Sequence, residues 1–325
     1  MVAWGGRRLK WLSVMSCILN LGANGWSKRL AAALTIAGLA LGLGTRADAR
    51  TPPGDAMQHF VSISDYIGTI RVVQSATSKL EIVSATQGTS DIYGFEIEHS
   101  DDDEIHIHGT APPGSMNCVR KNGVLHVSVN NGPPILVSAL PEIVIAAPLS
   151  SQIQLSVRAG DVSIGEVGRL DAIVGGCSAL DADAVNGEFD LRTTGSAQVR
   201  VGRVARAVID ATQGGVISLD TVTNGLDARL GGTARLVSDS LDGDSRFVQA
   251  GTSQVLVSKA RMNTLDVSLD GASRFGLEGD VLAASFDIRS AARAIASGNI
   301  SLQNVQLLRA GRLSLNGQRW REDRI

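Results

Sequence analysis

Apolar and polar residues alternate with a period of two along most of the chain after residue 55, and this pattern predicts β-strands. The alternation is clearest between residues 155 and 318, in short runs such as Val199-Arg200-Val201 and Val255-Leu256-Val257. No long segment of this region has the period of an amphipathic helix. We therefore expect an all-β fold.

A glycine recurs about every 19 residues in the same region, and an alternating run follows it each time. The steps between successive glycines are 16, 19, 19, 18, 19, 20 and 40 residues, and the double step passes over Ala291. Nine units are expected. Their predicted corner glycines are Gly160, Gly176, Gly195, Gly214, Gly232, Gly251, Gly271 and Gly311.

A unit of this length cannot bury a core alone, but stacked units can. Glycine suits a corner that needs positive φ or has no room for a side chain. We predict a right-handed parallel β-helix of about nine coils, because parallel crossovers prefer that hand. A β-sandwich or barrel would explain the turn spacing but not the glycine column, and the leucine ladder of a leucine-rich repeat is absent.

The organisation around the repeat is less regular. Residues 50–150 contain seven segments with a strand pattern, and we expect them to form irregular first coils or a cap, because no linker composition separates them from the repeat at 151–318. A separate small β domain is the alternative. Residues 319–325 combine charges with Trp320, so they predict a C-terminal cap or, failing that, a frayed tail.

Residues 27–49 have the features of a secretory signal: a basic pair, an apolar stretch of about fourteen residues and a small-residue site ending at Ala49. We expect residues 1–49 to be a leader that is cleaved after Ala49. The protein would then reach the periplasm or cell surface of a Gram-negative-type bacterium.

Residues 1–26 leave three interpretations of this leader open. The n-region is extended or translation starts at Met15, a twin-arginine signal uses Arg7-Arg8, or a lipid is attached at Cys17. Cleavage after Ala49 leaves 24 basic and 31 acidic residues, a net charge of −7. The near-zero net charge of the full chain, −2, argues against a dedicated nucleic-acid binder, and the hydrophobic content of 44% argues against a disordered chain.

Residues 141–164 read as an apolar strand, then Ala147-Pro148-Leu149, then a second strand that ends in Gly-Asp-Val-x-Ile. With the small-residue segments 194–197, 231–234 and 250–253, this resembles the GIN domain family, also called the auto-transporter adhesin head family. The resemblance covers about residues 58–318 and implies an exported bacterial β-solenoid. Ser290-Ala291-Ala292 departs from the pattern, because this unit lacks the glycine.

Several units contain an apolar-Asp-apolar-Arg sequence, and alternation places its Asp and Arg on the same outward face. Coils stack about 4.8 Å apart, so a column of bare carboxylates would repel itself, and a neighbouring Arg neutralises it. This face is either a solvated, self-paired surface or a ridge that binds a glycan or envelope polymer. The candidate binding residues are Asp190, Arg192, Asp227, Arg229, Asp287 and Arg289.

A second polar ladder is possible at Arg235, Gln254 and Arg274, because each lies three residues after a predicted corner glycine. Solubilising side chains beside a turn would give the same pattern. Cys118 and Cys177 remain after cleavage, and export permits a disulfide between them, but the spacing does not decide between a pair and two free thiols.

Signals for chemistry are weak. His106 and His108 share a strand face near acidic residues 101–104, but this pattern is more typical of an exposed strand than of a metal site. We expect no cofactor, no metal and no catalytic residues, because the acids recur at the repeat period rather than in a cluster. The expected function is an exported, non-enzymatic binding or adhesion domain. A structural envelope domain and a polysaccharide-acting enzyme are the alternatives.

Overall fold

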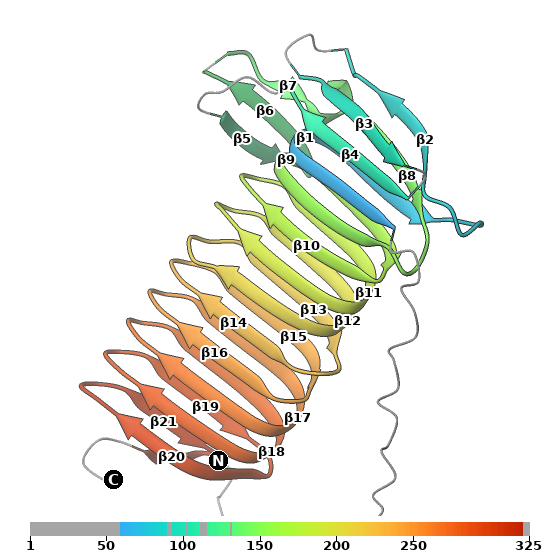
Figure 1. Cartoon of the computed structure of the whole chain (residues 1–325). Helices are drawn as coiled ribbons and strands as arrows, with labels where there is room; N and C mark the ends of the chain where they lie inside the picture. The colour runs from blue at the N-terminus through green and yellow to red at the C-terminus, as the bar shows by residue number, and fades with distance from the viewer. Residues whose placement is uncertain (1–58, 90–92, 102, 111–115, 131, 321–325) are drawn as a thin grey trace, which may run out of the picture. The chain divides into compact units, whose positions relative to one another are not determined.

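The computed structural model describes residues 59–89, 93–101, 103–110, 116–130 and 132–320 (Figure 1). These lie in one compact unit that spans residues 53–325. The predicted leader and its cleavage site lie outside the described residues. Among the described residues we find no helical segment that could span a membrane.

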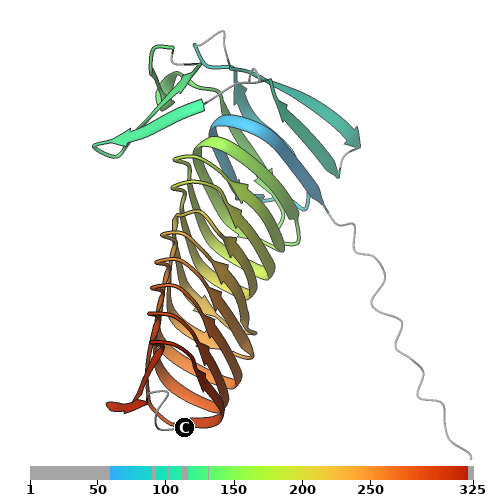
Figure 2. The ribbon, with the colours of Figure 1, turned by 90° about the vertical axis from the view of Figure 1, so that its left-hand side faces the viewer.

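The repeat region is a parallel β-solenoid, as the glycine spacing predicts (Figures 1 and 2). Successive coils pair in parallel at offsets of 17 to 20 residues, for example Gln198 with Val216, Val216 with Arg235, and Arg235 with Gln254. The solenoid strands are β9 (Gln152–Val167), β10 (Arg169–Val174), β11 (Ala179–Thr193), β12 (Gln198–Ala211), β13 (Val216–Val222), β14 (Leu226–Leu230), β15 (Arg235–Asp242), β16 (Ser245–Gln249), β17 (Gln254–Leu269), β18 (Arg274–Ile288), β19 (Arg293–Ser297), β20 (Ile300–Leu307) and β21 (Arg312–Leu315).

Each coil has two strand segments, one on each of two faces. The segment after a tight turn lies on what we call face 1, as in β13 and β15, and the segment after a bend lies on face 2, as in β14 and β16. The long strands β11, β12, β17 and β18 run through the bend and contribute to both faces.

A four-residue turn leads from face 2 to face 1 at each of eight places between residues 175 and 311. Its second residue has positive φ in seven of these turns; in the turn 212–215, Gly215 has positive φ instead. This conformation favours glycine. The seven second residues are Gly176, Gly195, Gly232, Gly251, Gly271, Ser290 and Arg309.

Three of the predicted corner glycines do not occupy this second turn position. The predicted gap, Ala291, does not occupy it either, because it is the third residue of its turn and follows Ser290. Gly160 is inside β9, where a Cβ atom would lie 2.1 Å from the carbonyl oxygen of Gly68. Gly214 and Gly311 are the third and fourth residues of their turns. A shift of one or two residues within a small-residue turn leaves the average spacing near 19, so the spacing alone did not reveal it.

The core is a stack of inward-facing side chains from both faces. Its largest members include Phe247, Phe275 and Phe286, and the ring centroids of Phe247 and Phe275 lie 5.1 Å apart. Small inward residues sit two positions before two of these rings: Ser245 before Phe247 and Ala284 before Phe286. Large and small side chains therefore alternate, and the narrow interior is filled without widening the coil.

The described part of residues 59–150 continues the same stack. β1 (Phe60–Gln74) pairs in parallel with β9 over both faces. On its other side β1 pairs in parallel with β4 (Glu104–Gly109) and β8 (Glu142–Ala147). The antiparallel strands β3 (Phe95–Asp101) and β2 (Glu81–Thr86) pair with β4 and β8, so they end the parallel stack.

A three-stranded antiparallel lobe lies beside this first coil (Figure 2). It consists of β5 (Met116–Lys121), β6 (Val124–Val129) and β7 (Ile135–Leu136). Leu125 and Val127 of β6 are buried in a second small core with Ile67 and Ala159 of the solenoid.

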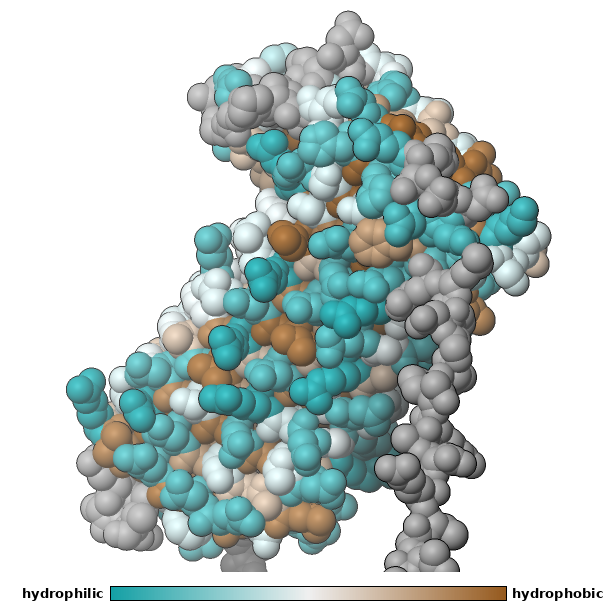
Figure 3. All heavy atoms as spheres, viewed as in Figure 1, coloured by the Kyte–Doolittle hydropathy of each residue, from teal (hydrophilic) through white to brown (hydrophobic). Residues whose placement is uncertain are grey.

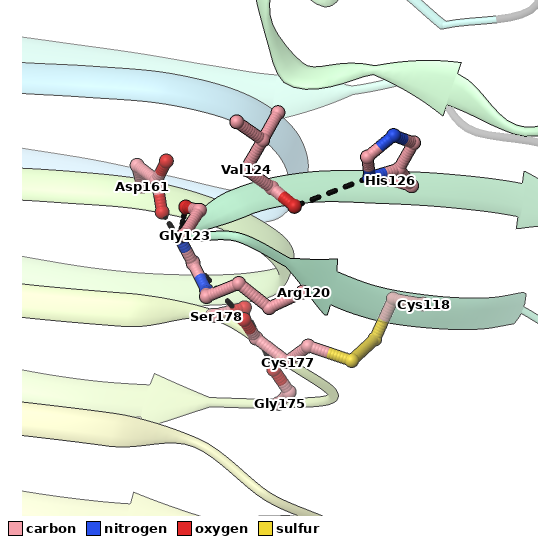
Figure 4. A network of polar contacts seen from close by, with 9 residues as sticks. All are labelled: Cys118, Arg120, Gly123, Val124, His126, Asp161, Gly175, Cys177 and Ser178. Atoms are coloured by element: carbon pink, nitrogen blue, oxygen red, sulfur yellow. Dashed lines mark hydrogen bonds and ion pairs between the residues drawn. A yellow bond between two sulfur atoms is a disulfide. The ribbon is translucent and has the colours of Figure 1, made fainter.

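A disulfide between Cys118 and Cys177 joins this lobe to the first four-residue turn (Figure 4). The guanidinium of Arg120 donates hydrogen bonds to the carboxylate of Asp161 and, at 3.2 Å, to the carbonyl oxygen of Cys177. The pairing that the sequence left open is therefore present, and an ion pair supports it.

At the other end, β22 (Gln318–Trp320) folds back antiparallel to β21. Trp320 lies opposite Leu313 and packs against the core. The rest of the expected C-terminal cap, residues 321–325, lies outside the described residues.

Candidate functional site

The outward side chains of face 2 form two columns that run from coil to coil, and their order follows from the strand register. Column A consists of Gln154, Asp171, Asp190, Val208, Asp227, Arg246, Asp266, Ser285 and Asn304. Column B, two residues further along each strand, consists of Ser156, Ile173, Arg192, Asp210, Arg229, Val248, Ser268, Asp287 and Gln306.

Four of the six predicted binding residues occupy the expected positions on this face. Asp190 and Asp227 are in column A, and Arg192 and Arg229 are in column B. Asp210 lies between the two arginines in register. In this part of column B the charge therefore alternates from coil to coil. Opposite charges neutralise each other within column B, and not only between an Asp of column A and an Arg of column B as the sequence predicts.

The third predicted pair is displaced by two residues. Phe286 aligns with Val267 of the preceding coil, so Asp287 falls in column B. Arg289 lies in the following turn and binds the carboxylate of Asp287 with two hydrogen bonds, of 3.0 and 2.6 Å. This contact raises the pKa of Arg289, and it occupies both side chains.

A groove of about 410 Å³ lies at the N-terminal end of face 2. Its walls combine hydroxyl, amide and charged groups with a few apolar side chains, and they include Asp190 and Arg192. The other walls come from Ser62, Ile63, Ser64, Gln154, Leu155, Ser156, Arg169, Asp171, Ala172 and Ile173.

Hydrogen bonds fix part of this groove. Arg169 contacts Asp171 on its own strand and Glu188 on the next coil, at 3.3 and 3.1 Å. Gln152 also donates to Asp171, at 3.3 Å. The hydrogen bond that Arg169 donates to Asp171 raises the pKa of Arg169. Asp171 is therefore held as an acceptor in a network, whereas Asp190 and Arg192 form no ion pair within the described part of the chain.

A second groove of about 390 Å³ lies further along the same face. Its lining includes Arg246, Asp266, Ser285, Asp287 and Asn304, all from columns A and B. Both grooves thus lie on one continuous face. Figure 3 shows hydrophilic side chains spread over the coils, with small hydrophobic areas between them.

Such a face can donate and accept hydrogen bonds at intervals of about 4.8 Å. On each strand, the column A residue and the column B residue together include at most one carboxylate. Among the described residues, no group of three or more His, Cys, Asp or Glu side chains could hold a metal ion. The Nδ1 atom of His108 instead makes a 2.8 Å hydrogen bond with Ser64, and His106 lies 3.5 Å from Glu104.

Arg235, Gln254 and Arg274, the possible polar ladder, lie at one register position. The three residues align on face 1 in successive coils. We call their register position column C, and it continues through Arg293 and Arg312.

Sequence reasoning missed Gln154 and Ser156, which extend the face 2 columns onto the first coils. The Asp-x-Arg sequence is absent there, and only the register with Asp171 and Ile173 brings these residues into line. In the sequence, the only sign that these two residues belong to the columns is that they are polar and lie one coil length before Asp171 and Ile173.

Comparisons with family models, with curated proteins and with solved structures give no match to this chain. The site is therefore interpreted from its own geometry.

Proposed function

We propose that this protein is an exported, non-enzymatic β-solenoid whose face 2 binds an extended, polar polymer of the cell envelope, such as a glycan. The observation that supports the proposal is the continuity of columns A and B past two grooves on one face. An extended ligand can repeat the same hydrogen bonds from coil to coil. The resemblance to the GIN domain family fits this role.

The charge of the face fits the same proposal. Columns A and B hold six Asp and three Arg side chains among neutral ones, so the two signs are interspersed, with an excess of acids. Ligand recognition would then depend on hydrogen bonds to hydroxyl and amide groups, with few ionic contacts. Exposed ion pairs contribute only about 0 to 1 kcal/mol each to stability, so the columns are not needed to hold the fold together.

The test is co-sedimentation of the purified protein with isolated sacculi and with outer-membrane vesicles, at low and moderate salt. We expect saturable pelleting with one of them. The double variant Arg192→Gln/Arg229→Gln should weaken it by roughly a hundredfold, because each of the two lost charge-assisted hydrogen bonds costs about 1.5 kcal/mol or more.

The matched control is Arg200→Gln/Arg203→Gln, which removes the same charge from side chains that contact Asp220 and Glu166 away from face 2. It should pellet as the unchanged protein does. Absence of pelleting with both materials would favour a structural envelope role, and release of soluble sugars from sacculi would favour an enzyme.

A further inference from the structure

Column C ends in a row of three arginines on face 1. Arg274, Arg293 and Arg312 occupy the same register position in successive parallel strands. Strands in a sheet lie about 4.8 Å apart, so the three side chains leave the backbone from adjacent rungs. All three are exposed.

These three arginines form no ion pair within the described part of the chain. Among the described residues, no carboxylate lies within ion-pair distance of any of the three, whereas Arg200, Arg203 and Arg261 each contact an acid. The outward positions beside them are also uncharged: they hold Gly276, Ile295 and Ser314.

The fold brings a fourth arginine to the same place. β22 folds back on β21 so that Arg319 lies opposite Ser314, on the outward side with Arg312. A cavity of about 190 Å³ forms there. Its walls come from Arg293, Ile295, Arg312, Leu313, Ser314, Arg319 and Trp320.

Packing and stability do not account for this arrangement. Like charges that face each other across a strand pair are destabilising, and this row has no acid to offset them in the described part of the chain. The chain after the expected cleavage is acidic as a whole, with a net charge of −7, so a basic cluster is a local exception. A ligand with several negative charges would remove the repulsion.

We propose that this arginine cluster (Arg274, Arg293, Arg312 and Arg319) is a binding site for an acidic polysaccharide that carries repeated carboxylates. The planar guanidinium fork matches a carboxylate with two parallel hydrogen bonds. The row spans three rungs, which suits successive charged groups of a polymer better than a single small anion. The cluster lies on face 1, so the proposal is independent of the proposed role of face 2.

A single-stranded nucleic acid is a less suitable ligand, because such sites usually combine basic groups with exposed aromatic platforms for the bases. Of the side chains that line the cavity, only Trp320 is aromatic, and it packs against the core.

The experiment measures binding of the purified protein to immobilised polygalacturonate, with neutral dextran as the blank and sodium chloride varied. We expect saturable binding that weakens as salt rises, because exposed charge contacts are screened. The triple variant Arg274→Gln/Arg293→Gln/Arg312→Gln should lose about a hundredfold or more in affinity, through the loss of charge-assisted hydrogen bonds.

The control is Arg200→Gln/Arg203→Gln/Arg261→Gln, which changes the net charge equally but removes arginines that already contact acids. Its affinity should stay within about twofold of the unchanged protein. A second variant, Arg274→Lys/Arg293→Lys/Arg312→Lys, keeps the charge but not the guanidinium fork, and its affinity should lie between those of the triple Gln variant and its control. Circular dichroism and urea midpoints check that each variant is folded.

Three results would overturn the proposal: no binding to polygalacturonate at low salt, equal losses in the triple variant and its control, or tighter binding of single-stranded DNA through the same arginines. The two proposals have separate readouts: the face 2 test measures pelleting of Arg192→Gln/Arg229→Gln with sacculi and vesicles, whereas this test compares the affinity of the arginine-cluster triple variant and its control for polygalacturonate. Failure of the face 2 proposal would therefore leave this one standing, and the reverse also holds.

Discussion

The turn residues carry the strictest local demand in the solenoid. Gly251 has φ of +71°, and a Cβ atom on it would lie 2.9 Å from the carbonyl oxygen of Gly232 in the preceding coil. Ser290 and Arg309 meet the same backbone demand without being glycine. Positive φ costs a residue with a side chain roughly 1–2 kcal/mol, so glycine is the favoured residue at this turn position, although not the only one found.

Gly251→Ala should therefore lower the free energy of unfolding by about 1–2 kcal/mol from the backbone alone, and by more if the close contact does not relax. Arg309→Gly is the reciprocal change and should raise the same quantity by up to about 1 kcal/mol. Urea denaturation followed by circular dichroism measures both. An unchanged midpoint for Gly251→Ala would show that the turn tolerates a Cβ atom.

The residue scale is also where the sequence was least informative. Asp287 follows a Phe as Asp190 does, yet the two lie in different columns because β18 is aligned by Phe286 with Val267. The position of Arg312 was missed for the same reason. It directly follows Gly311, whereas the predicted ladder residues lie three residues after a glycine, and only the strand register aligns it with Arg293 and Arg274. Motif matching fixes a register only where the turn lengths are known.

At the scale of elements, strand type and the period of the coil follow directly from alternation and glycine spacing. The lobe of β5, β6 and β7 does not, because its contacts join segments distant in sequence. Cys118 and Cys177 are 59 residues apart in sequence, and their Cα atoms lie 5.8 Å apart. This proximity depends on how the lobe packs on the first coil, so the amino-acid spacing could not reveal the pair.

The disulfide should stabilise the lobe more than the coils. Removing it in Cys118→Ala/Cys177→Ala should cost about 2–4 kcal/mol, mainly through the freedom gained by the unfolded loop. We expect faster hydrogen exchange at amides of β5 and β6, with β14 to β17 unchanged. The small core around Leu125 and the ion pair of Arg120 would limit the loss. Equal exchange rates in the lobe would contradict this account.

At the scale of the whole molecule, each coil contacts mainly its neighbours, so stability is close to a sum over coils and their interfaces. Deleting residues 216–234 removes one register unit and would place Arg235 in register with Gln198, since Val216 links these two positions. This shortened chain should fold, with a β-rich circular dichroism spectrum and a cooperative unfolding transition.

Deletion of residues 216–224 is the control, because it removes about half a coil and puts inward side chains out of line. It should give aggregated or unfolded protein. If the whole-coil deletion were no better folded than the half-coil deletion, contacts between distant coils would have to matter more than the stack suggests.

The uniform four-residue turn also determines how such a protein can change over generations. A duplication or loss of one coil preserves the turn, the core and both outer faces at the junction. The length of the chain, and with it the number of rungs on each face, can therefore vary in whole coils without a new fold having to arise. The length of polymer that the protein contacts would be set by the number of coils, while the chemistry of each contact would be set separately by the outward side chains.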